Sequence, residues 1–240
     1  MPLARINNRL LHFVHIPKTG GSGITDYMRR KGKVALYSRE ELEWSHTTPQ
    51  HMAFDVRNIL LPDGFADASF AILRNPLERL LSEYRYRATR YCGGSNKIGK
   101  VSKNDKLTVE LDWNEKFYGT FGEWVNVVFE KCLADPYACD NHIRPQVDFV
   151  GRNLNIFLFE RGLEKVLEWI DLITDTNRLS ASLDRNESNK IRIEVSDRDL
   201  ERIREFYKCD YDLINSLKHS SADCQIIEQI NQNLDPISVI

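Results

Sequence analysis

Short apolar runs alternate with longer segments of helical periodicity along most of the chain. We expect strands over residues 10–16, 34–37, 69–73 and 155–159. We expect helices over residues 23–30, 49–60, 77–91, 120–132, 163–174 and 197–207. This alternation predicts an α/β fold, with a mostly parallel central sheet flanked by helices, in a single domain over residues 1–240. The stretch from residue 92 to 118 carries the weakest signal for regular structure.

A glycine-rich turn follows the first expected strand. It reads HIPKTGGSG over residues 15–23 and leads into the first expected helix. A strand, a glycine-rich turn and a helix together aim several backbone N–H groups at one anion. The glycines let the backbone approach that anion, and Lys18 can neutralise it. In the usual nucleoside triphosphate loop, GxxxxGK[ST], the lysine follows the last glycine; here it comes first, and no GK[ST] occurs in the chain.

A second anion-binding segment follows the strand expected at residues 69–73. Arg74 ends that apolar run, and Pro76 occupies a position where a first helical turn tolerates proline. Ser82 lies about two turns into the helix that follows. Ligands of parallel sheets bind at the carboxyl ends of the strands, so we expect both segments at one edge.

The two segments together resemble sulfotransferases that use 3′-phosphoadenosine 5′-phosphosulfate (PAPS). They are most similar to the carbohydrate O-sulfotransferase branch with the heparan and uronyl 2-O enzymes. In that family a PKTG-type loop binds the 5′-phosphosulfate, and an R-[DN]-P-x-x-R-x-x-S-x-Y segment binds the 3′-phosphate. The likeness covers residues 17–22 and 74–84 and extends, with gaps, from about residue 10 to 215. It implies a P-loop-like sulfotransferase fold, PAPS as donor, its product PAP (3′-phosphoadenosine 5′-phosphate), and no metal.

The resemblance also implies a set of donor-binding residues. Residues 186–190 are similar to the family's N-x-S-x-[RK] loop, which can fold over the nucleotide in relatives. One departure is Gly23, which stands where family loops often carry a second hydroxyl. The expected donor-binding residues are Pro17, Lys18, Thr19, Gly20, Gly21, Ser22, Gly23, Arg74, Ser82, Ser188 and Lys190.

Sulfuryl transfer to a sugar hydroxyl needs a general base, and histidine suits this role because its pKa lies near neutrality. The 2-O enzymes carry a catalytic histidine about twenty residues before the R-[DN]-P segment. His51 lies 23 residues before Arg74 and fits that spacing best; His46, 28 residues before it, remains an alternative. Lys18 is expected to stabilise charge on the leaving oxygen. His142, in a segment resembling the family's H-x-x-P-Q loop, could also approach the acceptor.

The charge of the chain limits the classes of molecule that it is expected to bind. The net charge of −2 argues against a general nucleic-acid binder. Residues 85–106 nevertheless hold seven basic side chains against one acid, Asp105. We expect this basic run to lie near the donor site and to favour an anionic carbohydrate acceptor, although a solvated loop without a ligand is the alternative.

Targeting and cysteine signals point to a soluble protein. No apolar run of about 18 residues marks a membrane helix, and no signal-peptide core precedes the first strand. We therefore expect a cytoplasmic relative of bacterial type, or else the catalytic domain of a Golgi-lumenal enzyme. The five cysteines leave a Cys132–Cys139 disulfide open, and the absence of a CxxC pair argues against structural zinc.

Two other functions remain open from the sequence. A P-loop-type kinase would share the fold, but the lysine order and the missing GK[ST] argue against it. A non-catalytic module that binds PAP or PAPS without turnover would keep the same donor residues. Only the assignment of a base separates this module from an enzyme.

Overall fold

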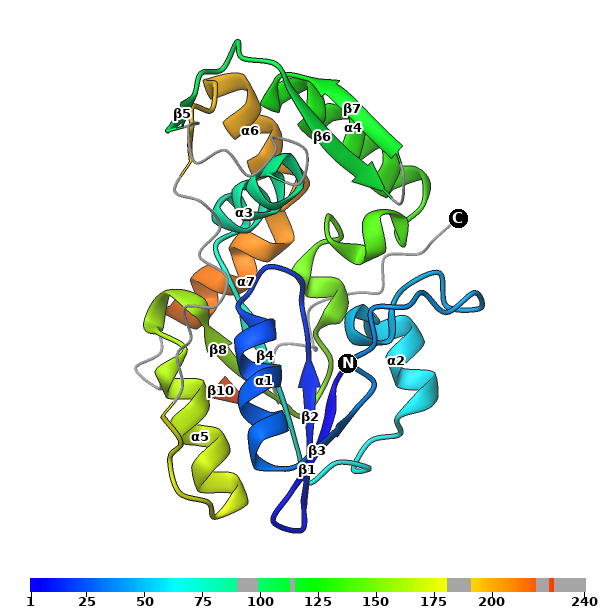
Figure 1. Cartoon of the computed structure of the whole chain (residues 1–240), viewed down its shortest axis with the longest axis vertical. Helices are drawn as coiled ribbons and strands as arrows, with labels where there is room; N and C mark the ends of the chain where they lie inside the picture. The colour runs from blue at the N-terminus through cyan, green and yellow to red at the C-terminus, as the bar shows by residue number, and fades with distance from the viewer. Residues whose placement is uncertain (90–98, 113–114, 181–190, 219–224, 227–240) are drawn as a thin grey trace.

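A six-stranded sheet forms the centre of the computed structural model, which describes residues 1–89, 99–112, 115–180, 191–218 and 225–226 (Figure 1). The strand order is β10-β8-β4-β2-β1-β3. The strands are β1 (Leu3–Ile6), β2 (Arg9–Val14), β3 (Lys33–Ala35), β4 (Ala68–Leu73), β8 (Leu154–Leu158) and β10 (Gln225–Ile226). All four strands expected from the sequence are present, with bounds shifted by one or two residues.

The sheet is mixed, so the expectation of a mostly parallel sheet is wrong. Only β2, β4 and β8 run parallel to one another; β1 is antiparallel to both β2 and β3, and β10 is antiparallel to β8. β1 folds back on β2 through Asn7 and Asn8, whose φ angles are 44° and 63°. Two consecutive residues with positive φ make the tight hairpin turn that asparagine tolerates well. The parallel centre of the sheet, however, carries both anion-binding segments.

Seven α-helices lie in the described part of the chain. They are α1 (Gly21–Lys31), α2 (Phe54–Leu60), α3 (Pro76–Thr89), α4 (Phe121–Ala134), α5 (Glu164–Thr174), α6 (Asp197–Phe206) and α7 (Lys208–Lys218). The helix expected over residues 49–60 is split, because Met52 and Ala53 are extended between the 3₁₀ helix η1 (Pro49–His51) and α2. Within these described residues, none of the helices has the length and apolarity needed to span a membrane.

Two apolar cores cover the two faces of the sheet. On one face Ile24 of α1 and Ile170 of α5 pack with Phe13 and Phe70 of the sheet. On the other face Val14, Leu73 and Ile156 pack with Phe149 of η3 (Gln146–Phe149) and Ile214 of α7. The central strands are therefore buried on both sides, which explains their continuous apolar sequences.

A third core lies beyond the carboxyl edge of the sheet, where α3, α4 and α6 meet (Figure 1). The hairpin of β6 (Leu107–Asp112) and β7 (Glu115–Gly119) covers it, and β5 (Lys100–Val101) pairs with β9 (Arg192–Ile193). The region expected to be weakest in regular structure thus contains a hairpin. The sequence pattern that indicates β6 is the alternation of Val109 and Leu111, which are both buried, with polar neighbours. Residues 90–98 lie outside the described part.

Candidate active site

The two anion-binding segments meet at the carboxyl edge of the parallel strands. Val14 of β2 pairs with Ala71 of β4, so the residues that follow these strands emerge side by side. Arg74 Nη1 donates a hydrogen bond to the backbone carbonyl of Lys18 at 3.0 Å. The sequence expectation that residues 15–23 and 74–84 form one site edge is consistent with this direct contact.

The turn before α1 depends on its glycines. Gly20 has a φ of 85°, and a Cβ there would lie 2.7 Å from Leu163 Cδ1. A Cβ on Gly21 would overlap the ring of His15. Lys18 also takes a left-handed conformation, with φ 67°. A non-glycine residue in this region is strained, and such strain concentrates at functional sites.

The N-terminus of α1 has no capping side chain. Gly20 occupies the cap position, and the first turn holds no acidic residue. The Thr19 hydroxyl instead donates to the carbonyl of Ile16 at 2.8 Å and closes the turn. In contrast, α4 is capped by Thr120, whose side chain accepts from the backbone N–H of Glu123. The first-turn N–H groups of α1 therefore remain suited to an external anion.

Two cationic side chains lie beside this N-terminus. Lys18 Nζ lies 4.1 Å from the centre of the Tyr86 ring on α3. The Arg74 guanidinium lies 4.4 Å from the centre of the Phe159 ring. Arg74 Nε is enclosed and bonds to none of the described residues. Burial lowers the pKa of Arg74; an anion at this site would offset that cost.

Gln146 fixes the backbone of Arg74. Its side-chain oxygen accepts from the Arg74 N–H at 3.0 Å, and its Nε2 donates to the Arg74 carbonyl at 2.8 Å. Asp210, fully buried on α7, accepts in turn from the Gln146 backbone N–H at 2.9 Å. The segment that resembled H-x-x-P-Q thus holds Arg74 at the end of β4.

Three histidine rings form a cluster next to the loop. The ring centres of His15 and His51 lie 4.9 Å apart, and those of His51 and His142 lie 4.8 Å apart, both edge-on. His46 is exposed and stacks on Tyr137 at 5.9 Å. Of the two candidate bases, His51 is the one that lies in the cluster.

Asp140 orients His51. Its Oδ2 lies 2.7 Å from His51 Nδ1 and accepts from the Thr48 hydroxyl at 2.9 Å. Asn141 Nδ2 also donates to the His51 carbonyl at 2.9 Å. Cys139, Asp140 and Asn141 all have positive φ angles of 53–60°, an unusual run that turns the Asp140 carboxylate toward His51.

The same contacts set the charges of this pair. Burial lowers the pKa of His51 to about 4, although Asp140 opposes that shift. Burial would raise the pKa of Asp140, but His51 outweighs it and the pKa falls to about 2. At neutral pH the pair is a carboxylate and a neutral imidazole, with the proton on Nδ1 and Nε2 available as an acceptor.

A second carboxylate contacts the third histidine. Glu83 Oε2 on α3 lies 2.8 Å from His142 Nδ1, and its other oxygen accepts from Arg87 Nε. Glu83 is fully buried. Burial opposes ionisation, but His142 and Arg87 outweigh it and hold the pKa of Glu83 well below its usual value.

The cluster also has the composition of a metal site. His51, Asp140 and His142 offer ligand atoms that all lie within 4.8 Å of one another. Two ligands at about 2.0–2.1 Å from one tetrahedral zinc lie about 3.3 Å apart. The 2.7 Å between His51 Nδ1 and Asp140 Oδ2 is instead a hydrogen-bond distance. The arrangement fits a hydrogen-bonded pair better than two ligands of one ion.

A family comparison agrees with the donor-site geometry. A model described as the sulfotransferase family matches residues 6–215. The chain belongs to the sulfotransferase family. The match includes the loop before α1, Arg74 and all three clustered histidines, and it supports sulfuryl transfer as the general reaction. No curated protein and no solved structure matches the chain.

The remaining expected site residues of this sulfotransferase are placed as follows. Ser82 is buried on α3, directly before Glu83. Ser22 is exposed at the start of α1, and Gly23 follows it half-buried. Ser188 and Lys190 lie outside the described residues, so their expected contact with the nucleotide stays a prediction.

The basic run is partly neutralised within the sulfotransferase itself. Arg87 is buried against Glu83 and donates to the Leu111 carbonyl at 2.7 Å. Lys100 lies 3.9 Å from Glu194, and Lys106 lies 3.8 Å from Glu123. Arg90 and Lys97 are outside the described part of the chain. The charge that this run offers to a ligand is therefore smaller than its sequence suggests.

Cys132 and Cys139 do not form the disulfide that the sequence left open. Both are free and buried. Cys139 Sγ donates to the Leu111 carbonyl at 2.9 Å, and burial raises the pKa of Cys132 to about 11. Cys132 therefore remains a thiol at neutral pH and lacks the properties of a reactive thiolate.

The sequence did not indicate three residues in or next to the histidine cluster, namely His15, Asp140 and Glu83. No motif marked His15 as a neighbour of the candidate base, yet its ring lies against His51. Asp140 and Glu83 carried no motif, and only the fold shows that each carboxylate contacts a histidine. The sequence did hold one indication for Glu83, which directly follows Ser82. It lies four residues before Arg87, the spacing at which an acidic and a basic side chain pair on one face of a helix.

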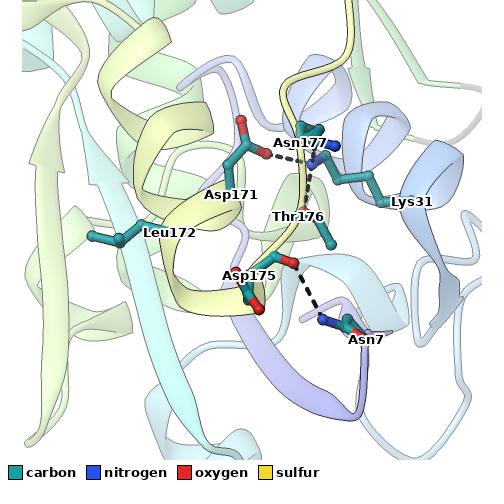
Figure 2. Close-up of a pocket in the computed structure, with 7 residues that line it drawn as sticks. All are labelled: Asn7, Lys31, Asp171, Leu172, Asp175, Thr176 and Asn177. Atoms are coloured by element: carbon teal, nitrogen blue, oxygen red, sulfur yellow. Dashed lines mark hydrogen bonds and ion pairs between the residues drawn. The ribbon is translucent and has the colours of Figure 1, made fainter.

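A cavity of about 740 Å³ lies at the opposite end of α1 (Figure 2). Lys31 Nζ there pairs with Asp171 and donates to Thr176 Oγ1 at 2.6 Å. Asn7 Nδ2 donates to the Thr174 carbonyl at 2.9 Å. Lys31 thus fastens the end of α1 to the end of α5, and Asn7 fastens the turn between β1 and β2 to the same end of α5. We assign this hollow a structural role.

Proposed function

We propose that this sulfotransferase moves the sulfuryl group of PAPS to a hydroxyl of a carbohydrate acceptor. The observation that carries the proposal is the contact of Arg74 with the Lys18 carbonyl, beside the uncapped N-terminus of α1. This contact brings two cationic side chains and a helix N-terminus to one edge of the sheet. A donor with separate 5′ and 3′ anionic groups matches two such neighbouring sites.

The chain's own residues fit this donor. The loop amides of residues 18–23 and the Lys18 ammonium would hold the 5′-phosphosulfate, and Arg74 and Ser82 the 3′-phosphate. Arg74 Nε, enclosed and unbonded among the described residues, is a donor in need of such an acceptor. When bound, PAPS supplies the activated sulfuryl group. Catalysis then rests mainly on positioning and electrostatics.

His51 is the residue that we infer to act as general base. Its Nδ1 is committed to Asp140, and no described residue bonds its Nε2, which is thus the atom that would accept the hydroxyl proton. The Asp140 carboxylate stabilises the imidazolium that forms, and it holds the ring in one orientation. His46 lacks such a carboxylate partner in its described contacts.

An anionic saccharide is the acceptor that we propose within this class. The support is the basic run of residues 85–106, in which the structure describes Arg85, Arg87, Lys103 and the ion-paired Lys100 and Lys106. The Michaelis constant for the acceptor should rise with ionic strength, because salt screens an exposed charge excess over about 8–10 Å. The Lys97→Glu/Lys100→Glu variant should raise that constant without altering donor affinity. A neutral acceptor used equally well would refute the anionic class alone.

Titration calorimetry with PAP and ATP tests the donor assignment. We expect tight PAP binding that does not depend on magnesium, and weak ATP binding. A preference for ATP with magnesium would favour a P-loop-type kinase. Tight PAP binding without sulfate transfer to any acceptor would favour the non-catalytic module.

A further inference from the structure

The histidine cluster contains two histidine–carboxylate pairs, and the proposed base belongs to only one of them, His51 with Asp140. The other pair joins two separate parts of the fold, since Glu83 lies on α3 and His142 follows the 3₁₀ helix η2 (Ala138–Asn141). His142 Nδ1 and Glu83 Oε2 are 2.8 Å apart. Burying an ionised carboxylate is costly, so a buried glutamate in this place needs its cationic partners.

His142 has one nitrogen left for a ligand. Glu83 takes Nδ1, and no described residue bonds Nε2. The side chain keeps 15% of its surface exposed, whereas that of Glu83 keeps 1%. The backbone carbonyl of His142 is separately anchored by Arg79 Nη1 at 3.3 Å. A change of the His142 side chain would therefore leave the anchor of this loop in place.

The two histidines have different surroundings, which suits different roles. His51 is buried and contacts Asp140, and the positive charge of a protonated His142 helps to keep it neutral. His142 contacts Glu83, whose second oxygen binds Arg87. The charged and titratable groups around His142 include Glu83, Arg79 and Arg87 on α3, His51 on η1, Asp140 on η2, and His15 after β2. Lys18 also acts on this group, because its charge lowers the pKa of Glu83. Pairs of titratable groups in contrasting environments are typical of acid and base assignments.

We propose that His142, supported by Glu83, is a second catalytic residue that donates from Nε2 to an oxygen of the sulfuryl group during transfer. This inference rests on the proposed function. The sulfur–oxygen bond to the acceptor forms while the bond to the phosphate oxygen of the donor breaks. The acceptor proton moves to His51 Nε2, and the electron pair of the broken bond stays on the phosphate oxygen near Lys18. His142 donates a hydrogen bond throughout and keeps its proton.

His142→Gln tests this role, with kcat, acceptor KM, PAP affinity and the melting temperature as readouts. We expect kcat to fall by about 10²–10³-fold, as for the loss of one positioned donor, with PAP affinity unchanged. The acceptor KM and the melting temperature of His142→Gln should stay at the wild-type values, because the change removes only a donor to the sulfuryl group. Glu83→Gln should lower kcat as well, because it removes the carboxylate that orients the His142 ring.

Glu83→Gln leaves Arg87 without its buried partner and can destabilise the fold, so His142→Gln decides the question by itself. A wild-type kcat in His142→Gln would overturn the inference. So would a loss of rate together with a lower melting temperature or weaker PAP binding, since that pattern indicates a structural role. A rise in acceptor KM alone would also overturn it. Absence of PAP binding and sulfate transfer in the wild type would instead refute the proposed function.

Discussion

Arg74 Nη1 donates to the Lys18 carbonyl at 3.0 Å, and this bond joins the two anion-binding segments across 56 residues of sequence. Lys18 itself adopts a left-handed backbone conformation, with φ 67°. The guanidinium therefore supports the shape of the loop before α1 and leaves Nε for another acceptor. Arg74 has a structural and a proposed binding role at once.

Lys18→Ala and Arg74→Ala should each weaken PAP binding. Each removes a charge-assisted contact, which is worth about 1.5–3 kcal/mol. Arg74→Ala should also loosen the loop, because it removes the bond to the Lys18 carbonyl. Calorimetry measures both effects, with the exposed Arg152→Ala as a control that should bind like the wild type. Unchanged PAP affinity in both folded variants would refute the donor-site assignment.

His51→Ala should nearly abolish turnover and leave PAP binding intact. Loss of a general base typically costs about 10²–10⁴-fold in rate. His46→Ala is the matched control, since His46 is exposed and stacks on Tyr137, and it should remain active. Asp140→Asn should lose rate as well, because a neutral amide cannot stabilise the imidazolium. If His46→Ala is inactive and His51→Ala active, the two roles are reversed; if both are active, no histidine of this pair is the base.

Gly21→Ala should damage both the loop and the histidine cluster. An added Cβ would overlap the His15 ring, which packs against His51. We expect a lower melting temperature, a loss of stability of about 1–3 kcal/mol from overpacking, and weaker PAP binding. Gly99→Ala is the control, because nothing lies within 4 Å of a Cβ there. Equal stability and PAP affinity in both variants would contradict the tight packing of this loop.

The protein should become less stable as the pH falls from about 7.5 to 5.5. Burial lowers the pKa of His12, His15 and His51, so below about pH 6.5 the unfolded chain binds protons that the folded chain does not. Each such histidine contributes a slope of up to about 1.4 kcal/mol per pH unit, with stability greatest on the alkaline side. Urea unfolding at several pH values measures the slope. His12→Asn should reduce it, and an unchanged slope would contradict the neutral, buried state of His12.

The sequence predicted the parts of the fold that depend on local pattern. Continuous apolar runs indicated β2, β4 and β8, and glycines and Pro76 marked the two strand-to-helix turns. The antiparallel edge of the sheet was missed, because the turn at Asn7 and Asn8 is short and β1 has only four residues. Register and sheet order arise from long-range packing, which periodicity does not report.

The site shows the same division between local and long-range information. Lys18, Arg74 and His51 follow from motifs and spacing. Asp140 reaches His51 only because three consecutive residues take positive φ angles, and Glu83 reaches His142 only because α3 packs against the η2 loop. No spacing rule in the sequence joins these partners, which are 89 and 59 residues apart.

The sulfotransferase activity is measured by transfer of labelled sulfate from PAPS to a panel of neutral and acidic glycans, with a chelator present. We expect a sulfated glycan and an equal amount of PAP, formed without a divalent cation and largely lost in His51→Ala. Absence of a sulfated product with every acceptor, in a protein that binds PAP tightly, would contradict the proposed activity and leave a binding module without turnover.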